Sequence, residues 1–156
     1  NLLDSHDVPR FLSMCHGEGA LWKLGCILLI LMPGVPSLFY GDECGVEGVL
    51  EEDYRQPTPW GKERTFSDFI CQLIMIRNNY IDEKTDYRPI WELIRGGVFA
   101  FARTGPNGTL RVIINAGMEP LCCPISEEEK MVMSSGTDGE EDTIERKGYR
   151  ITLRNK

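Results

Sequence analysis

Several patterns that identify common classes of protein are missing from this sequence. It has six cysteines but no CxxC pair, which argues against a zinc ribbon or a thioredoxin-like site. It has no GxGxxG fingerprint, so nothing supports a dinucleotide site. The apolar run "GCILLILM" ends at Pro33 and is far too short to span a bilayer, and no signal peptide is visible.

Positive charge is also scarce. Lys and Arg number 17 against 24 Asp and Glu, which gives a formal net charge of -7. Such a chain lacks the basic surface that binds nucleic acid or anionic lipid, so we expect neither as a partner.

The composition is that of a globular protein, with 42% hydrophobic and 26% charged residues. Cys26 and Cys71 lie in apolar surroundings and are expected to be buried free thiols. Free thiols favour a reducing compartment, so a cytoplasmic location is expected.

The first residues are typical of a buried strand, which favours a C-terminal piece of a longer protein over removal of a leader.

The first half predicts two strand–helix units. Residues 1–3 resemble the end of a short buried strand, and 37–41 resemble a second strand. Apolar residues at helical spacing predict helices over 18–32 and 65–80. A loop at 4–17 precedes the first helix, and a polar loop at 41–63 precedes the second. The order βαβα is that of a parallel sheet with helices outside it, and such a sheet needs more strands at its edges.

The second half predicts a small antiparallel β domain. Short apolar or alternating segments occur at 90–95, 98–104, 109–117 and 149–155. "TGPNG" predicts a hairpin turn between two of them, which also explains the "NGT" sequon at Asn107. Residues 134–147 are expected to form an exposed loop, and "SEEEK" at 126–130 a solvated face or helix start.

Polar residues follow each predicted strand of the first half. Asp7 and His6 come just after the first strand, where α/β barrels carry catalytic groups, and the alternative is a loop-capping Asp beside a solvated His. Asp42 and Glu43 follow the second strand and could line the same site or stabilise the loop. Arg55, among acidic residues, suits either an ion pair or a substrate clamp.

Two further alternatives concern aromatic residues and metal ligands. Trp60 and Trp91 could stack on a sugar, yet core packing is the commoner role of a lone Trp. A metal site is the weaker idea, since the spacing of the nearby ligand types matches no known pattern: His6, Asp7, Cys15 and His16.

These segments resemble the alpha-amylase family of glycoside hydrolases. "NLLDSHDVPRFL" is similar to the strand and loop around that family's third catalytic carboxylate, and "PGVPSLFYGDECGVEG" to its last barrel strand and following loop. "RQPTPW" continues the match. The combination of "SHD" with "GDE", Arg and "PW" is most similar to the neopullulanase, cyclomaltodextrinase and maltogenic amylase branch. "VFAFARTGPNGTLRVIINAG" resembles the family's C-terminal β-sandwich.

The resemblance implies an α/β plus all-β chain. Residues 1–87 would form the last two βα units of a (β/α)8 TIM barrel, and 88–156 a C-terminal antiparallel β-sandwich domain. By position, Asp7 matches the carboxylate that stabilises the transition state, and His6 matches a sugar-binding His. Arg55 matches a substrate-contacting arginine. Four residues before Arg55, that branch usually has Asp followed by Pro, whereas this sequence has Glu51 and Glu52. Val49 and Leu50 stand where the branch usually has Gly-Asn.

The implied activity is retaining hydrolysis of an alpha-glucan, at α-1,4 bonds with α-1,6 bonds as the alternative. The nucleophile and the acid/base of that family lie on earlier barrel strands, so we expect this chain alone to be inactive. No cofactor is expected, and these residues do not support calcium. A homodimer of the longer enzyme is compatible with the family. A non-catalytic carbohydrate-binding or interaction protein of the same superfamily is the alternative.

Overall fold

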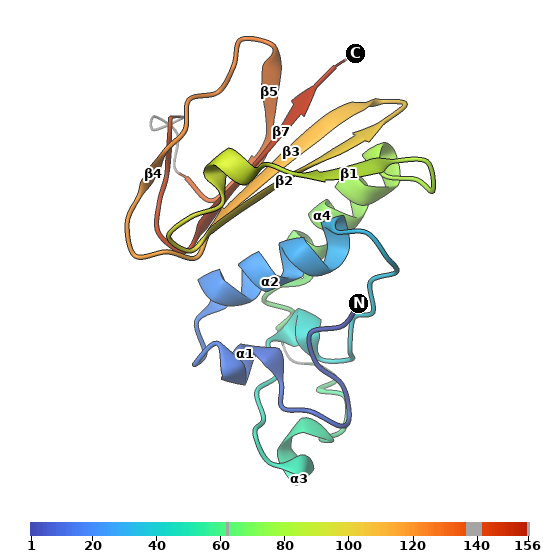
Figure 1. The fold of residues 1–156 in the computed structure, drawn as a ribbon. Coiled ribbons are helices and arrows are strands. Elements are labelled where there is room, and N and C mark those ends of the chain that lie inside the picture. Colours follow the sequence, from blue (N-terminus) through green and yellow to red (C-terminus); the bar gives the residue numbers. More distant parts are fainter. Residues whose placement is uncertain (62, 137–141, 156) are drawn as a thin grey trace. The chain divides into compact units, whose positions relative to one another are not determined.

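The computed structural model describes residues 1–61, 63–136 and 142–155, and the chain divides into two compact units. Unit 1 covers Asn1–Ile76 and unit 2 covers Arg77–Lys156. Unit 1 is helical in its regular structure, and unit 2 consists mainly of β-strands (Figure 1). The division falls within helix α4, Ser67–Tyr80, and strand β1 begins at Asp86, ahead of the domain boundary expected after residue 87.

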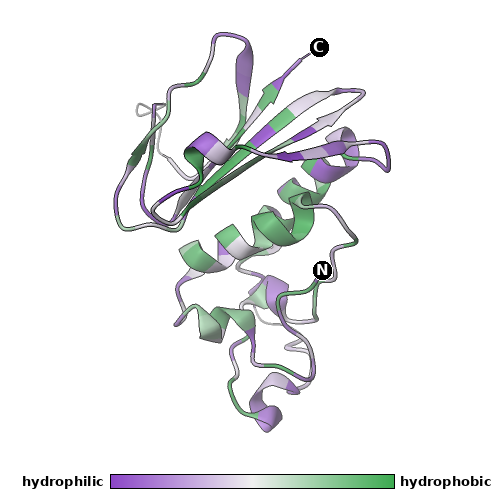
Figure 2. Cartoon of the chain, viewed as in Figure 1, coloured by the Kyte–Doolittle hydropathy of each residue, from purple (hydrophilic) through white to green (hydrophobic). Residues whose placement is uncertain are grey.

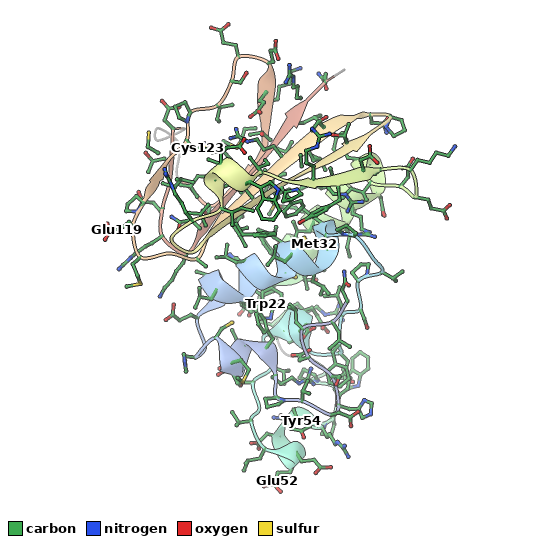
Figure 3. The ribbon with its side chains drawn as sticks, viewed as in Figure 1. Trp22, Met32, Glu52, Tyr54, Glu119 and Cys123 are labelled. Atoms are coloured by element: carbon green, nitrogen blue, oxygen red, sulfur yellow. The ribbon has the colours of Figure 1, made fainter. Side chains whose placement is uncertain are left out.

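Helix α2, Gly19–Leu31, confirms the helix predicted over 18–32. It is apolar around most of its circumference (Figure 2), as expected of a buried helix. Trp22, labelled on α2 in Figure 3, is 1% exposed and stacks on Phe66 with ring centroids 4.2 Å apart. Helix α1, Phe11–Met14, was predicted as loop. It packs against α2 at Gly25, where an added Cβ would lie 2.3 Å from the Phe11 ring.

Neither strand predicted in the first half is present as a strand, and both predictions were wrong in this respect. Residues 1–3 and 37–41 hold no strand hydrogen-bond ladder in the part of the chain that the structure describes. The backbone of Asn1 nevertheless donates to Val35 O and accepts from Ser37 N, each at 2.8 Å. This is the pattern of one parallel bridge, so the two segments run parallel but pair at a single residue.

The predicted polar loop at 41–63 contains two short helices. These are the 3-10 helix η1, Asp42–Cys44, and helix α3, Glu51–Tyr54. Helix α4 then confirms the second predicted helix but begins two residues later than expected, and its buried side chains lie on one side: Phe69, Ile70, Leu73 and Ile76.

Unit 2 contains a five-stranded antiparallel sheet with strand order β1-β2-β3-β7-β5 (Figure 1). Its strands are β1 (Asp86–Pro89), β2 (Val98–Gly105), β3 (Gly108–Asn115), β5 (Glu129–Ser134) and β7 (Gly148–Arg154). The strands predicted at 98–104, 109–117 and 149–155 are therefore confirmed, with small shifts at their ends. The hairpin is confirmed as well, because Gly105 pairs with Gly108.

Other predictions for unit 2 were wrong in whole or in part. Residues 90–95 contain the 3-10 helix η2, Trp91–Leu93, because the chain leaves the sheet after Pro89. For "SEEEK" the solvated face is confirmed, since Ser126, Glu127 and Glu128 are exposed, but the segment leads into β5 rather than into a helix. The predicted loop at 134–147 includes β6, Thr143–Ile144, which pairs with β4, Leu121–Cys122; residues 137–141 lie outside the described residues.

One face of the large sheet is partly covered by the β4–β6 pair and by η2. The buried cluster there joins Val98, Ala100 and Ile113 of the sheet to Cys123 and Ile144, and Ile90, Leu93 and Leu121 pack against it. Figure 3 places Cys123 on the segment that follows β4. Two layers with an apolar interior are the arrangement expected of a small β-sandwich.

All six cysteines are free. Cys26 is buried, as predicted, but Cys71 is exposed, because it lies on the side of α4 opposite the buried residues. Within the described residues, no helix is long and apolar enough to cross a membrane.

Candidate functional site

The four residues predicted as a site come together in unit 1. Arg55 Nη2 lies 3.3 Å from Asp7 Oδ1, and Arg55 Nη1 lies 2.8 Å from Glu51 Oε1. Arg55 Nε donates to the backbone carbonyl of His6 at 2.7 Å. His6 Nε2 lies 3.2 Å from Asp7 Oδ2. Arg55 is thus the common partner of the other three residues.

Short local structure presents His6 and Asp7. Ser5 and Val8 form an isolated antiparallel bridge, and the Asp7 N–H donates to Ser5 Oγ at 3.1 Å, so the chain turns tightly at 5–8. The turn places the two polar side chains at its tip. Serine and aspartate favour such turns because their side chains bond nearby backbone groups.

Helix α3 presents Glu51 and Arg55. The pair has i,i+4 spacing, which puts both side chains on one side of a helical turn. Asp53 Oδ2 accepts from the Leu50 N–H at 3.3 Å at the start of α3. This turn forms although Glu51 and Glu52 replace the Asp-Pro typical of the neopullulanase branch. Figure 3 labels Glu52 and Tyr54 on the same helix.

The four side chains are open to solvent. The exposed fractions are 67% for His6, 65% for Asp7, 67% for Glu51 and 46% for Arg55. Exposed ion pairs contribute little to stability, typically about 0–1 kcal/mol. The cluster is therefore better suited to contacting a ligand than to stabilising the fold. Its carboxylates, imidazole and guanidinium are groups that can bond hydroxyls.

A second group of charged residues is buried. Asp4 is 4% exposed, Arg10 0% and Asp42 6%. Arg10 Nη1 donates to Tyr40 O at 2.7 Å and lies 3.8 Å from Asp42 Oδ1, and its guanidinium carbon lies 4.2 Å from the Phe39 ring centroid. Burial, followed by the charge of Asp4, raises the pKa of Asp42 to about 7. We call Asp4, Arg10 and Asp42 the buried triad.

Sequence reasoning missed Asp4 and Arg10 and left the role of Asp42 open. Asp42 is buried and does not join the exposed cluster, which favours the loop-stabilising alternative. Glu43 takes the same role, since its Oε2 accepts from the Gly41 N–H at 3.0 Å. One sequence feature could have indicated Asp4 and Arg10. In "DSHDVPR" these two oppositely charged residues flank the polar turn, one before it and one after it.

The remaining candidates do not join the cluster. Trp60 is 81% exposed and Trp91 is 74% exposed, so the expectation of core packing was wrong for both. Among the described residues, no group of three or more His, Cys, Asp and Glu side chains could hold a metal ion, so the residues weighed for a metal site do not assemble into one. A pocket of about 430 Å³ in unit 2 is lined by none of the predicted site residues.

The comparisons with known proteins match this chain to one family. The family model "Alpha amylase, catalytic domain" matches residues 1–90, more than half of the chain. The chain belongs to the alpha-amylase family. The match covers every residue of the exposed cluster and of the buried triad.

Relatives within the alpha-amylase family bear names from the predicted branch. Neopullulanase 2 of Thermoactinomyces vulgaris is 32% identical over 119 residues, 74% of this chain and 20% of the relative. Cyclomaltodextrinase of Thermoanaerobacter pseudethanolicus is 30% identical over 151 residues, 94% of this chain and 24% of the relative. The chain thus spans about a quarter or less of these relatives. Their names confirm the resemblance to the neopullulanase and cyclomaltodextrinase branch.

A solved structure within the family confirms the fold class. The native debranching enzyme of Nostoc punctiforme aligns with 99% of this chain and 35% of its own, at a TM-score of 0.81 and 29% identity. The chain therefore has the α/β plus all-β fold of the end of a (β/α)8 barrel followed by a β-sandwich.

Proposed function

We propose that this chain is the C-terminal part of a retaining alpha-glucan hydrolase that cleaves α-1,4 bonds, with α-1,6 bonds as the alternative. The observation that carries the proposal is the exposed cluster around Arg55. The family resemblance implies substrate-site roles for Asp7, His6, Glu51 and Arg55, and in support of these roles each of the other three contacts Arg55 within hydrogen-bonding or ion-pairing distance.

In this proposal Asp7 stabilises the transition state. A retaining glycosidase passes through a positively charged, oxocarbenium-like state between a nucleophile and an acid/base about 5 Å apart. We place those two groups on earlier barrel strands outside this chain. Asp7 would bond substrate hydroxyls in the distorted ring and add negative charge near the developing cation. Asp7 does no covalent chemistry here.

His6, Arg55 and Glu51 would bind the sugar and hold Asp7 in place. His6 can donate from its imidazole to a sugar hydroxyl. Arg55 bonds the His6 carbonyl and the Asp7 carboxylate at once, so it limits the motion of both. Glu51 offers a second carboxylate, which contacts Arg55 Nη1 while Asp7 contacts Nη2.

The partner in this proposal is an alpha-glucan oligosaccharide or polysaccharide of the starch, maltodextrin, cyclodextrin or pullulan type. Two relatives are named for pullulan and cyclomaltodextrin, which supports this class.

We further propose a cytoplasmic location, supported by the six free thiols, and a homodimer of the longer enzyme.

The test compares this chain with the longer reading frame that would contain it. The longer protein is expected to release reducing sugar from cyclomaltodextrin, pullulan or starch, and this chain alone is expected to release none. Turnover by the chain alone would contradict the placement of the nucleophile and acid/base elsewhere. A longer protein that binds maltoheptaose but hydrolyses none of the three substrates would favour the non-catalytic alternative.

A further inference from the structure

The large sheet of unit 2 carries a pocket of about 430 Å³ on its strands β1, β2 and β3, which lie side by side (Figure 1). Small-molecule sites in proteins have volumes of roughly 300–1,000 Å³, so the pocket is large enough for a ligand. The residues that line it are Asp86, Tyr87, Arg88, Ala102, Thr104 and Thr109. None of them belongs to the exposed cluster or to the buried triad, so the proposed function leaves the pocket without a role.

The strand register places the pocket on the face of the sheet that β4, β6 and η2 cover in part. Ala102 and Thr104 follow the buried Ala100 at alternate positions of β2, so all three side chains lie on one face. The cross-strand partners of Ala102 and Thr104 share this face, and they are Asp86, Arg88, Thr109 and Arg111. The face is therefore apolar and buried around Ala100, and polar and open farther along β2.

Ala102 provides the floor of the pocket. In the register it lies between Arg88 of β1 and Arg111 of β3, so a single methyl group separates two long side chains. Ala102 is half-buried and lines the pocket, so the space above its methyl group is open. A bound molecule could thus place carbon atoms on this methyl group and polar atoms against the side chains around it.

The side chains around Ala102 both donate and accept hydrogen bonds. Thr104 Oγ1 lies 3.1 Å from Thr109 Oγ1, so one hydroxyl can donate to the other and the pair still offers a donor to a ligand. The carboxylate of Asp86 accepts hydrogen bonds, and the guanidinium of Arg88 donates them. Both of these side chains are exposed, and neither has an ion pair with a described residue. Their hydrogen-bonding capacity is therefore available to a ligand.

Strand β1 adds two backbone groups at the rim of the pocket. The Ile90 N–H donates to Ala100 O, which makes Arg88 and Asp86 the next residues of β1 that bond to β2. The intervening Tyr87 therefore directs its N–H and C=O away from β2. Because β1 is the edge strand of the sheet, these groups face its open edge.

The charges around the pocket balance, which favours a neutral ligand. Asp86 and Arg88 contribute one charge of each sign, and Arg111 Nη1 lies 3.4 Å from Glu129 Oε2. An anion would be repelled by Asp86 and a cation by Arg88, with no surplus charge to hold either ion. A saccharide is uncharged, and each of its hydroxyls can donate and accept, so it matches this set of groups.

We propose that the pocket on β1, β2 and β3 binds a short segment of an alpha-glucan. Arg88 and Asp86 bond hydroxyls of the sugar, the threonine pair bonds a further hydroxyl, and the ring lies over Ala102. The preference for a neutral saccharide rests on the pocket alone, whereas the choice of an alpha-glucan rests on the proposed function. Unit 2 would thus hold the same polymer on which the longer enzyme acts.

Backbone amide signals of the ¹⁵N-labelled 156-residue chain provide the test. Maltotriose is expected to shift the signals of Tyr87, Ala102 and Thr104. Inorganic phosphate, and cellotriose with the same sugar unit in β-linkage, should cause much smaller shifts at equal concentration. No shift of these signals with maltotriose, or equal shifts with phosphate, would overturn the site. Equal shifts with cellotriose would overturn the choice of an alpha-glucan.

Two variants make the test specific. Ala102→Leu fills the space above the methyl group, and Arg88→Ala removes the guanidinium. Each should weaken maltotriose binding about tenfold, as the loss of one hydrogen bond to a charged group does. Arg146→Ala, at an exposed arginine that does not line the pocket, is the matched control for Arg88→Ala. Equal affinities of Arg88→Ala and Arg146→Ala, or unchanged affinity in Ala102→Leu, would overturn the site, and either variant suffices if the other does not fold.

The same titration distinguishes this site from the proposed function. The amide signals of His6 and Asp7 report on the exposed cluster, and that of Thr104 reports on the pocket. Shifts confined to His6 and Asp7 would overturn the pocket and leave the proposed function standing. Shifts at Thr104, in a chain whose longer form hydrolyses no alpha-glucan, would support the pocket and overturn the proposed function.

Discussion

Arg55 Nη2 lies 3.3 Å from Asp7 Oδ1, although 48 residues separate the two in sequence. The same guanidinium also bonds the His6 carbonyl and Glu51. One side chain of the second polar loop thus fixes both residues of the first. In the proposed function, this contact joins the residue that stabilises the transition state to the residues that bind sugar.

Replacing Arg55 by Lys should weaken substrate binding with little effect on stability. Lysine keeps the charge but has no planar, multi-pronged donor set, so it cannot bond Asp7, Glu51 and the His6 carbonyl together. We expect KM for a maltooligosaccharide in the longer enzyme to rise about tenfold, since one lost charge-assisted bond corresponds to roughly 1.5 kcal/mol. Arg64→Lys, at another exposed arginine of unit 1, is the matched control. Equal KM values for the two variants would refute this role.

Arg10→Met should instead destabilise the fold. Arg10 is fully buried, and removing one member of a buried charged group leaves the other charges uncompensated, at a cost of roughly 3–5 kcal/mol. Arg55→Met, at a side chain 46% exposed, should change the free energy of unfolding by less than about 1 kcal/mol. Urea unfolding of the 156-residue chain measures both. Similar losses in the two variants would contradict the distinction between buried triad and exposed cluster.

Asp42 should make stability depend on pH between about 4 and 7. Its pKa is raised from 3.8 to about 7, so the folded state binds a proton that the unfolded state releases. The stabilisation is full below the unfolded pKa and is lost as pH rises through 7, at about 1.4 kcal/mol for each pKa unit. The free energy of unfolding of the wild type minus that of Asp42→Asn should fall over this range and then level off. A difference that rises with pH would reverse the sign and contradict the raised pKa.

The three tryptophans should differ sharply in their effect on stability. Trp22→Ala removes a buried ring stacked on Phe66 and should cost roughly 3–5 kcal/mol of the free energy of unfolding. Trp60→Ala and Trp91→Ala remove exposed rings and should change it by about 0.5 kcal/mol or less. Thermal unfolding monitored by circular dichroism distinguishes them. A large loss for Trp60→Ala would mean that its ring is buried in solution.

The regular elements with a strong local pattern could be predicted from the sequence. Helices α2 and α4 have long apolar sides, and β2 and β3 flank a recognisable turn. The wrong strand predictions lie where strand formation depends on pairing with a segment distant in the sequence. β1 is a short edge strand that pairs with β2 and ends at Pro89, whereas the more strand-like residues 90–95 continue that pairing only through the Ile90 N–H to Ala100 O among the described residues and then enter η2. Residues 1–3 and 37–41 share a single parallel bridge, which a local pattern cannot reveal.

The candidate site was predictable in part. The neighbours His6 and Asp7, and the i,i+4 pair Glu51 and Arg55, are evident from spacing, and the family resemblance indicated that both pairs matter. The contact from Arg55 to Asp7 depends on how the two loops fold and could not be derived from spacing. Asp4 and Arg10 were missed because charged loop residues are normally solvated, and only the structure shows them buried.

The most direct test of the account is kcat of the longer enzyme with Asp7→Asn. Glu43→Gln is the matched control, because glutamine keeps the oxygen that accepts from the Gly41 N–H. If Asp7 stabilises the transition state, Asp7→Asn should lower kcat by roughly three orders of magnitude, as losing one preorganised electrostatic group does elsewhere, while Glu43→Gln stays near the wild type. An Asp7→Asn enzyme with unchanged kcat would contradict the central claim.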